Sequence, residues 1–160
     1  HEEGARGEEK VARVLEALPE GWRIYHGVPL AGKTLDHVVV SPEQVYLIET
    51  VHWPGQVQVL DGHLMHGEEA YTGYELATLL GRGDQAADEL GVPRPAVSCL
   101  VCIVGGRYHQ HPGEKDGVWI GEIQDLGPYL LQHHGAGIDT SLRLSVLETL
   151  DTRLDKEKTL

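Results

Sequence analysis

Apolar positions recur at helical spacing in the first segment of the chain. Residues 5–18, ARGEEKVARVLEAL, place their aliphatic side chains on one face, and Pro19 follows where such a helix has to stop. Glu8 lies on the apolar, inward face near the start of this helix, whereas Glu9 lies on the polar face. A first-turn acid favours the helix dipole, which accounts for Glu9 more simply than for Glu8.

Strand patterns follow the helix. An extended run covers 22–30, and the apolar runs at 34–40 and 45–51 are joined by SPEQ, a polar turn of the kind that closes a β-hairpin. A second hairpin is predicted over 55–67, with the Asp-Gly dipeptide at 61–62 as its two-residue turn. The pattern therefore begins with one helix and two hairpins.

The rest of the chain mixes helices and strands. Helices are predicted at 74–90, 123–133 and 141–154, and strands at 97–104 and 118–121. Glycines at 81 and 83 predict an interruption of the first of these helices, and the loop 105–117 is expected to be exposed and mobile. This order predicts one domain, residues 1–160, of the α/β class, an α+β sandwich in which helices flank a mixed central β-sheet.

Composition limits the partners of this domain. Hydrophobic residues make up 41% of the 160, enough for one continuous core. The chain has 13 basic and 25 acidic residues and a net charge of -12, so any contact with DNA must be local. No apolar run approaches the roughly 20 residues of a membrane span. Cys99 and Cys102 lie in an apolar strand, and we expect them to be reduced, as in a cytoplasmic protein.

Two acids face each other across the first hairpin. If residues 41–44 form the turn, Val40 pairs with Val45, and counting outward sets Asp36 opposite Glu49 with both side chains on one face. Like charges at that separation are unfavourable, so one carboxyl is protonated, or the pair is hydrated, or a divalent cation lies between them. Glu8 could supply a third oxygen ligand from the helix. Three such donors suit Mg²⁺ or Mn²⁺ and do not suit zinc.

Three segments of the chain also resemble a known family. GARGEEKVARVLEAL, LDHVVV and VYLIETVHWPGQV are similar to the NERD (nuclease-related) domain, a branch of the PD-(D/E)xK nuclease superfamily. That family has a Gly-x-x-Gly-Glu helix start, an Asp that begins an apolar strand, and Glu-x-Lys before a Trp and a Gly. The three motifs occur in order within the first third of the chain. The resemblance implies a restriction-endonuclease-like core.

The resemblance also implies a set of site residues. It makes Glu8, Asp36 and Glu49 the metal-binding acids, with the Thr50 carbonyl as a further ligand, and Mg²⁺ or Mn²⁺ as the cofactor. Asp36 and Glu49 are then catalytic. Gln85 matches a catalytic glutamine that the family places on a helix after the hairpins, although the preceding Asn-Pro of the family is absent here. On its sequence context alone, Gln85 is more simply an amide on a helix surface.

The chain departs from the family pattern at Val51. The lysine of Glu-x-Lys shares a face with the glutamate, where it positions the attacking water or stabilises charge on the phosphate, and valine can do neither. His52 points to the other face, and Lys33 alternates away from Asp36. Arg82, near Gln85, is a possible displaced cation but is more simply a solvated surface charge. The same holds for Lys10 on the first helix.

Two functions are compatible with this pattern. The first is a metal-dependent DNA phosphodiesterase that is weakly active or inactive, or that uses a displaced cation. The second is a noncatalytic binding or regulatory module that keeps the nuclease fold. The three acids favour the first function, whereas the missing lysine and the acidic composition favour the second.

Overall fold

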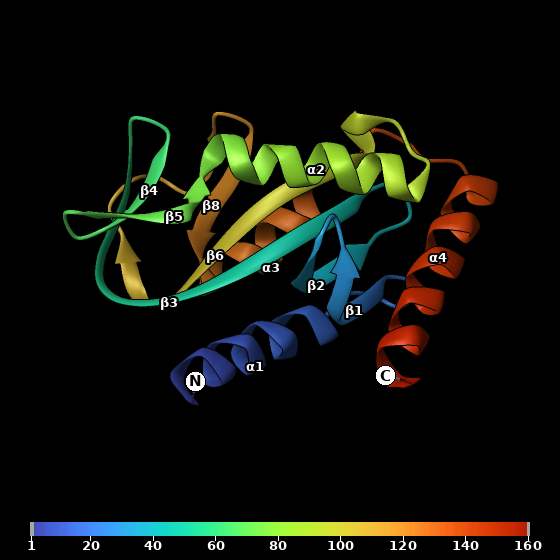
Figure 1. Cartoon of the computed structure of the whole chain (residues 1–160), viewed down its shortest axis with the longest axis horizontal. Helices are drawn as coiled ribbons and strands as arrows, with labels where there is room; N and C mark the ends of the chain where they lie inside the picture. The colour runs from blue at the N-terminus through green and yellow to red at the C-terminus, as the bar shows by residue number, and fades with distance from the viewer. Residues whose placement is uncertain (1, 160) are drawn as a thin grey trace.

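A mixed β-sheet forms the centre of the protein, and helices cover both of its faces (Figure 1). The computed structural model describes the backbone of residues 2–159 and the side chains of residues 6–70 and 74–155. The helices are α1 (Glu2–Glu16), α2 (Leu76–Leu90), the short 3-10 helix η1 (Arg94–Ala96), α3 (Ile123–Gln132) and α4 (Thr140–Thr159). The strands are β1 (Arg23–Leu30), β2 (Lys33–Val40), β3 (Val45–Leu60), β4 (His63–His66), β5 (Glu69–Glu75), β6 (Val97–Tyr108), β7 (Gly113–Lys115) and β8 (Val118–Glu122).

The strands lie in the order β1-β2-β3-β6-β8-β7, and β4 and β5 extend the sheet from the far half of β3. β1, β2 and β3 are antiparallel, whereas β3, β6 and β8 run parallel to one another. The sheet is therefore mixed. Together with its flanking helices it confirms the predicted α+β sandwich and is consistent with a restriction-endonuclease-like core.

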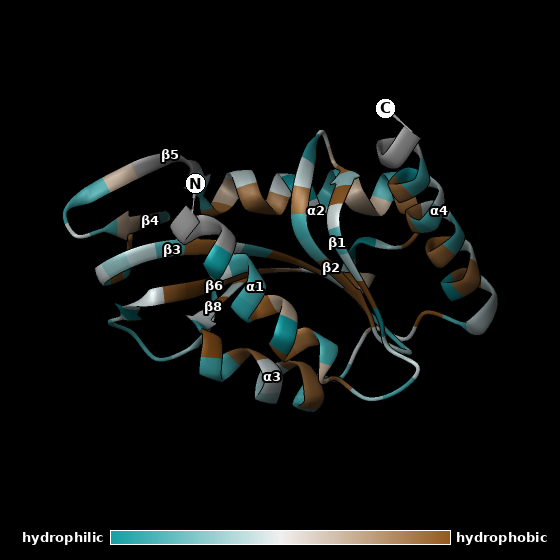
Figure 2. Ribbon diagram, turned by 90° about the horizontal axis from the view of Figure 1, so that it is seen from below, coloured by the Kyte–Doolittle hydropathy of each residue, from teal (hydrophilic) through white to brown (hydrophobic). Residues whose placement is uncertain are grey.

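Two hydrophobic cores lie on the two faces of the sheet. Side chains of α1 and α3, such as Leu15 and Leu126, pack against one face, and side chains of α2 and α4, such as Leu79 and Leu150, pack against the other. Figure 2 shows the apolar stretches of the central strands enclosed between these helices. Each residue of β3 therefore faces one helix pair or the other, according to strand alternation.

One predicted interruption is absent, and β3 is longer than the apolar run at 45–51. α2 runs without a break through Gly81 and Gly83. Gly83 is instead a point of close packing, because a Cβ atom there would lie 2.7 Å from Cys99 Sγ. β3 likewise continues through Pro54 and Gly55, with a shift of register against β6. At that shift a Cβ atom on Gly106 would lie 1.9 Å from the Trp53 carbonyl oxygen, so glycine is required on the neighbouring strand.

Parts of the expected loop at 105–117 are strands. Residues 105–108 extend β6, and 113–115 form β7 at the edge of the sheet. Cys99 and Cys102 are buried and free, as expected. Within the part of the chain that the structure describes, no helix combines the length and the apolar character that crossing a bilayer requires.

Candidate functional site

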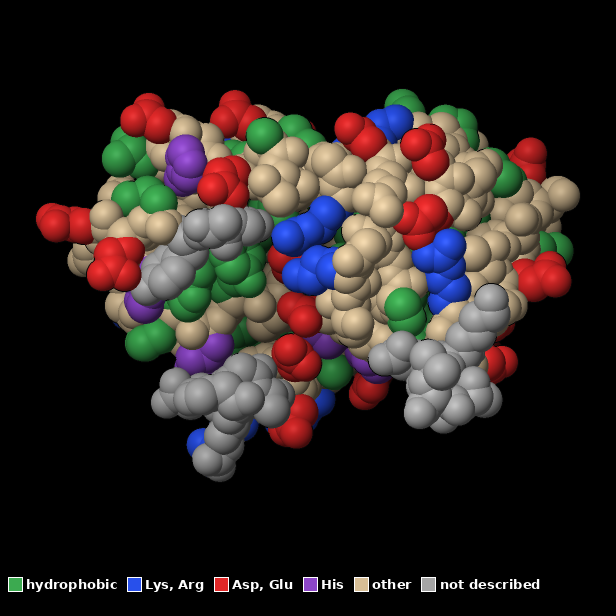
Figure 3. All heavy atoms as spheres, in the orientation of Figure 1, with side chains coloured by type: hydrophobic (Ala, Val, Ile, Leu, Met, Phe, Trp, Pro, Cys, Tyr) green, Lys and Arg blue, Asp and Glu red, His purple; other side chains and the backbone are tan. Residues whose placement is uncertain are grey.

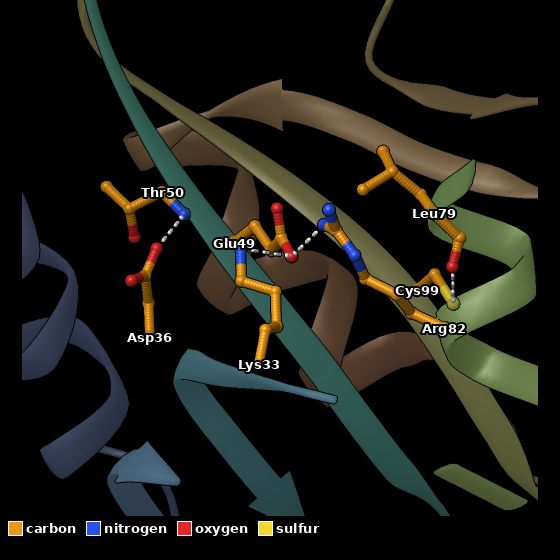
Figure 4. Close-up of polar contacts among 7 residues, drawn as sticks. All are labelled: Lys33, Asp36, Glu49, Thr50, Leu79, Arg82 and Cys99. Carbon is orange, nitrogen blue, oxygen red and sulfur yellow. Dashed lines mark hydrogen bonds and ion pairs between the residues drawn. The ribbon is translucent and has the colours of Figure 1, made fainter. Parts of the chain in front are cut away.

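The candidate site lies where β2 and β3 separate. Their ladder begins at Val40 and Val45, as the turn predicted, and ends with the pair His37 and Ile48. One step further, the Asp36 carboxylate accepts a hydrogen bond at 2.8 Å from the backbone N–H of Thr50 (Figure 4). The Asp36 side chain, in place of the backbone, thus makes the next hydrogen bond between β2 and β3.

Asp36 faces Glu8 of α1. The helix begins at Glu2, so Glu8 lies in its middle and not near its start as predicted. Glu8 and Asp36 line one open pocket, together with His26 and His37. Burial raises the pKa of both carboxyls, and the negative charge of Asp36 raises the pKa of Glu8 further. The Thr50 N–H opposes this effect at Asp36, because it stabilises the carboxylate. The pair therefore has the proximity and the excess negative charge that attract a cation.

A glycine of the first motif marks the place where α1 crosses β3. A Cβ atom on Gly7 would lie 3.7 Å from Thr50 Cγ2 and 3.4 Å from His52 Nδ1, which is van der Waals contact. The middle of the helix therefore rests directly on the strand. This contact brings Glu8 to the end of the β2–β3 ladder, next to Asp36.

Glu49 lies on the opposite face of β3, toward α2. Its side chain is only 7% exposed, and its Oε1 atom accepts hydrogen bonds from Arg82 Nη1 at 2.5 Å and from Lys33 Nζ at 3.2 Å (Figure 4). Its Oε2 atom is buried and accepts no hydrogen bond from the described residues. One oxygen of Glu49 therefore has two cationic partners and the other has none.

The expectation that Asp36 and Glu49 point to one face is wrong. Leu35 and Val38 both pack in the core under α2, so strict alternation fails across the two residues between them. Asp36 consequently turns toward Thr50 and Glu8, while Glu49 keeps the α2 side with Leu47. The two acids remain near each other, since the charge of Glu49 raises the pKa of Asp36.

Arg82 and Lys33 are not simple surface charges. Arg82 comes from the middle of α2, and Lys33 follows the tight turn between β1 and β2. Both end at the same buried oxygen of Glu49. The pattern of the sequence could not reveal this, because both side chains are long and reach Glu49 from elements far away in the chain.

Val51 occupies the motif-lysine position as an apolar core residue. It is 3% exposed and packs on the α2 side of β3, the face that also carries Glu49. His52 turns to the other face, between α1 and Gly105 of β6. The side chain at position 51 therefore points to the same face as Glu49, as the motif lysine would, but it carries no charge.

Gln85 lies on α2, beyond the point where Arg82 of the same helix reaches Glu49. It is exposed, its amide nitrogen would be 3.7 Å from a Cβ atom on Gly32, and it shares a hydrogen bond with Glu89. It follows Arg82 by three residues, so the two side chains share one side of the helix. The structure thus places Gln85 next to the β1–β2 turn, at the margin of the candidate site.

Tyr74 is a further residue near the site that the sequence pattern did not identify. Burial raises its pKa to about 12, and the charges of Glu49 and Asp36 contribute to the rise. Its ring meets Trp53 edge to face at 5.2 Å between centroids. β5, which carries Tyr74 next to its end, had no recognisable strand pattern, so its proximity to the acids could not be foreseen.

The donor set fits a hard divalent cation better than a soft one. Glu8, Asp36 and Glu49 offer carboxylate oxygens, the donors that Mg²⁺ and Mn²⁺ prefer. The Oε2 atom of Glu49 and the Oγ1 atom of Thr50 are buried without a partner, as expected where a ligand completes the contacts. Among the described residues, no three His, Cys, Asp or Glu side chains already converge on one point.

Comparison with known proteins agrees with this architecture. The sequence matches the model of one family, the nuclease-related domain or NERD, over residues 3–103. No curated protein matches the chain. The matched segment contains the helix α1, both hairpins, α2 and the start of β6, and thus Glu8, Asp36, Glu49 and Gln85. Because the match covers more than half of the chain, the protein belongs to the nuclease-related domain (NERD) family.

Proposed function

We propose that this domain is a metal-dependent DNA phosphodiesterase whose turnover is slow because position 51 lacks a lysine. The observation that carries the proposal is the buried, unpartnered Oε2 atom of Glu49 near Asp36 and Glu8, two acids whose pKa values burial raises. A buried carboxylate oxygen without a partner is costly for stability. A divalent cation would remove this cost.

The residues of the site have separate roles in this proposal. Glu8, Asp36, Glu49 and the Thr50 carbonyl would hold Mg²⁺ or Mn²⁺, which when bound polarises a phosphate and lowers the pKa of a coordinated water. The Thr50 N–H keeps the Asp36 carboxylate in place. Gln85, at the margin of the site, would contact the nucleic-acid backbone or the water.

The substrate contact is expected to be local. The net charge of -12 disfavours broad binding of DNA, and attraction has to come from the cation and the few basic side chains beside it. On the face shown in Figure 3, basic and acidic side chains lie side by side in the middle of the surface. We place the protein in the cytoplasm as part of the same proposal, because both thiols are free.

A combined metal-binding and cleavage assay tests this function. Mn²⁺ at millimolar concentration should raise the melting temperature by mass action on the folded state. Slow cleavage of duplex or single-stranded DNA should depend on Mg²⁺ or Mn²⁺ and disappear in Glu49→Gln. A folded protein that binds no Mn²⁺ would refute the metal site. A protein that binds Mn²⁺ but cuts no DNA would leave the noncatalytic module as the better account.

A further inference from the structure

We propose that Arg82 and Lys33 form a phosphate-binding cation pair that replaces the missing strand lysine, and that both exchange Glu49 for a DNA phosphate when Glu49 binds a divalent cation. The inference rests on the proposed function and names the side chains that would contact the substrate. It depends on three properties of the cluster around Glu49.

The first property is the charge balance at Glu49. Two cationic side chains, at 2.5 and 3.2 Å, share the single oxygen Oε1, while Oε2 has no partner. A buried carboxylate that only needed neutralisation would be satisfied by one cation with both oxygens engaged. Asp36 is a second carboxylate near the same cluster, because the charge of Glu49 raises its pKa and the charge of Lys33 lowers it. A divalent cation bound to these acids would therefore leave both Arg82 and Lys33 without a counter-charge, and two such side chains suit an anionic ligand.

The second property is the difference in solvent exposure among the three charged side chains. The side chain of Glu49 is 7% exposed, whereas that of Arg82 is 21% exposed and that of Lys33 is 39% exposed. An anion that approaches from solvent therefore meets the two cations before it meets the carboxylate. The cavity beside the ion pair, lined by Glu49, Arg82 and Cys99 among others, is only about 10 Å³ in volume, so the two cations can leave Glu49 only toward solvent.

The third property is that neither cation lies on β3. Arg82 comes from α2, and Lys33 comes from the start of β2, after the turn that joins it to β1. The next arginine near α2, Arg94, is already fixed by Asp84 at 2.6 Å and by the Val97 carbonyl. Arg82 and Lys33 thus provide, from outside the strand, the positive charge that Val51 cannot provide.

The exchange predicts opposite effects on two ligands. Arg82 and Lys33 compete with a divalent cation for Glu49, so their removal should leave Mn²⁺ binding intact or tighten it several-fold. The same change should weaken DNA binding, because the phosphate loses its cationic partners. A merely structural role would lower both affinities together.

Five variants test this prediction: Arg82→Gln, Lys33→Gln, the double variant, Arg82→Lys, and Arg13→Gln as a control with an exposed arginine on α1. Calorimetry with Mn²⁺ measures the metal affinity, and fluorescence anisotropy of a short duplex in Ca²⁺ measures DNA binding without relying on turnover. In the double variant, the slope of log K against log salt should become shallower by about 1.8, since each lost phosphate contact contributes about 0.9. Arg82→Lys should restore part of the DNA affinity.

Two results would overturn the inference while the proposed function stands. One is wild-type DNA affinity and salt slope in a folded double variant that binds Mn²⁺. The other is a parallel loss of Mn²⁺ and DNA binding in Lys33→Gln, whose position at a solvent-exposed hairpin makes misfolding an unsuitable explanation. If the wild-type protein binds no Mn²⁺, the proposed function and the inference fall together.

Discussion

The Asp36 carboxylate accepts a hydrogen bond from the backbone N–H of Thr50, 2.8 Å across the point where β2 and β3 part. The contact holds an acid at the edge of the gap between two central strands. It also satisfies a main-chain donor that the ladder no longer reaches. Asp36 thus has a structural role that can be separated from its charge, because an amide oxygen accepts the same hydrogen bond.

Asp36→Asn should therefore keep the fold and remove the metal response. The amide oxygen can still accept from Thr50, whereas the lost charge relieves repulsion with Glu8 and Glu49. Without metal at pH 7 the variant should melt at or above the wild-type temperature, and most of the Mn²⁺-induced rise should vanish. Differential scanning calorimetry with and without Mn²⁺ measures both. Asp116→Asn, in the turn between β7 and β8, is the matched control and should respond to Mn²⁺ like the wild type.

The metal-induced stabilisation should increase with pH. The pKa values of Glu8 and Asp36 are raised in the folded protein, so the folded state retains protons that the unfolded chain has released. Without metal, the stability from these groups is fully present below their unfolded pKa values of about 4 and is lost as pH rises through the folded values. Mn²⁺ displaces these protons and reverses the loss. Melting curves from pH 4.5 to 7 should show a growing difference between samples with and without Mn²⁺, and a constant difference would contradict the prediction.

His37 should make the protein sensitive to acid. Burial lowers its pKa to about 4, and its Nδ1 atom lies 2.8 Å from Nδ1 of His26. The unfolded chain binds a proton near pH 6.5, so the stability from neutral His37 is fully present above that value and is lost as pH falls toward about 4. The difference between these pKa values corresponds to on the order of 3 kcal/mol. Urea unfolding at pH 7 and pH 5 should show a smaller loss of stability in His37→Phe than in the wild type.

Val51→Lys should raise metal-dependent DNA cleavage. The side chain at position 51 shares the face of β3 that carries Glu49, so an ammonium group there would enter the site next to a metal-binding acid. Electrostatic contacts of this kind contribute roughly a hundredfold to the rate. Because Val51 is 3% exposed, the change should also cost roughly 1 to 3 kcal/mol of stability.

Two controls accompany this variant. Val51→Met has similar length without charge and should not raise the cleavage rate. Val51→Lys combined with Glu49→Gln should be inactive. A single variant that folds, binds Mn²⁺ and still leaves DNA intact would show that the site lacks more than the strand lysine.

The sequence was informative wherever local rules determine the outcome. The SPEQ turn and the alternation that follows it predicted the pairing of Val40 with Val45, and the observed ladder has that register. The faces of the acids were not predictable, because alternation is reset between Leu35 and Val38 by tertiary packing. The partners of Glu49 were not predictable either, since they reach it from α2 and from another hairpin.

Glu49 and Thr50 are consecutive residues of β3, yet their side chains belong to different layers, one under α2 and the other under α1. An ion held by Glu49 on one side and by Asp36 and Glu8 on the other would therefore connect the two hydrophobic cores through the sheet. Segments that open independently in the free protein would then open together. Amide hydrogen exchange in α1 and in α2 should therefore slow in parallel as Mn²⁺ is added. Such a parallel change would show that metal binding makes the two halves of the domain unfold cooperatively.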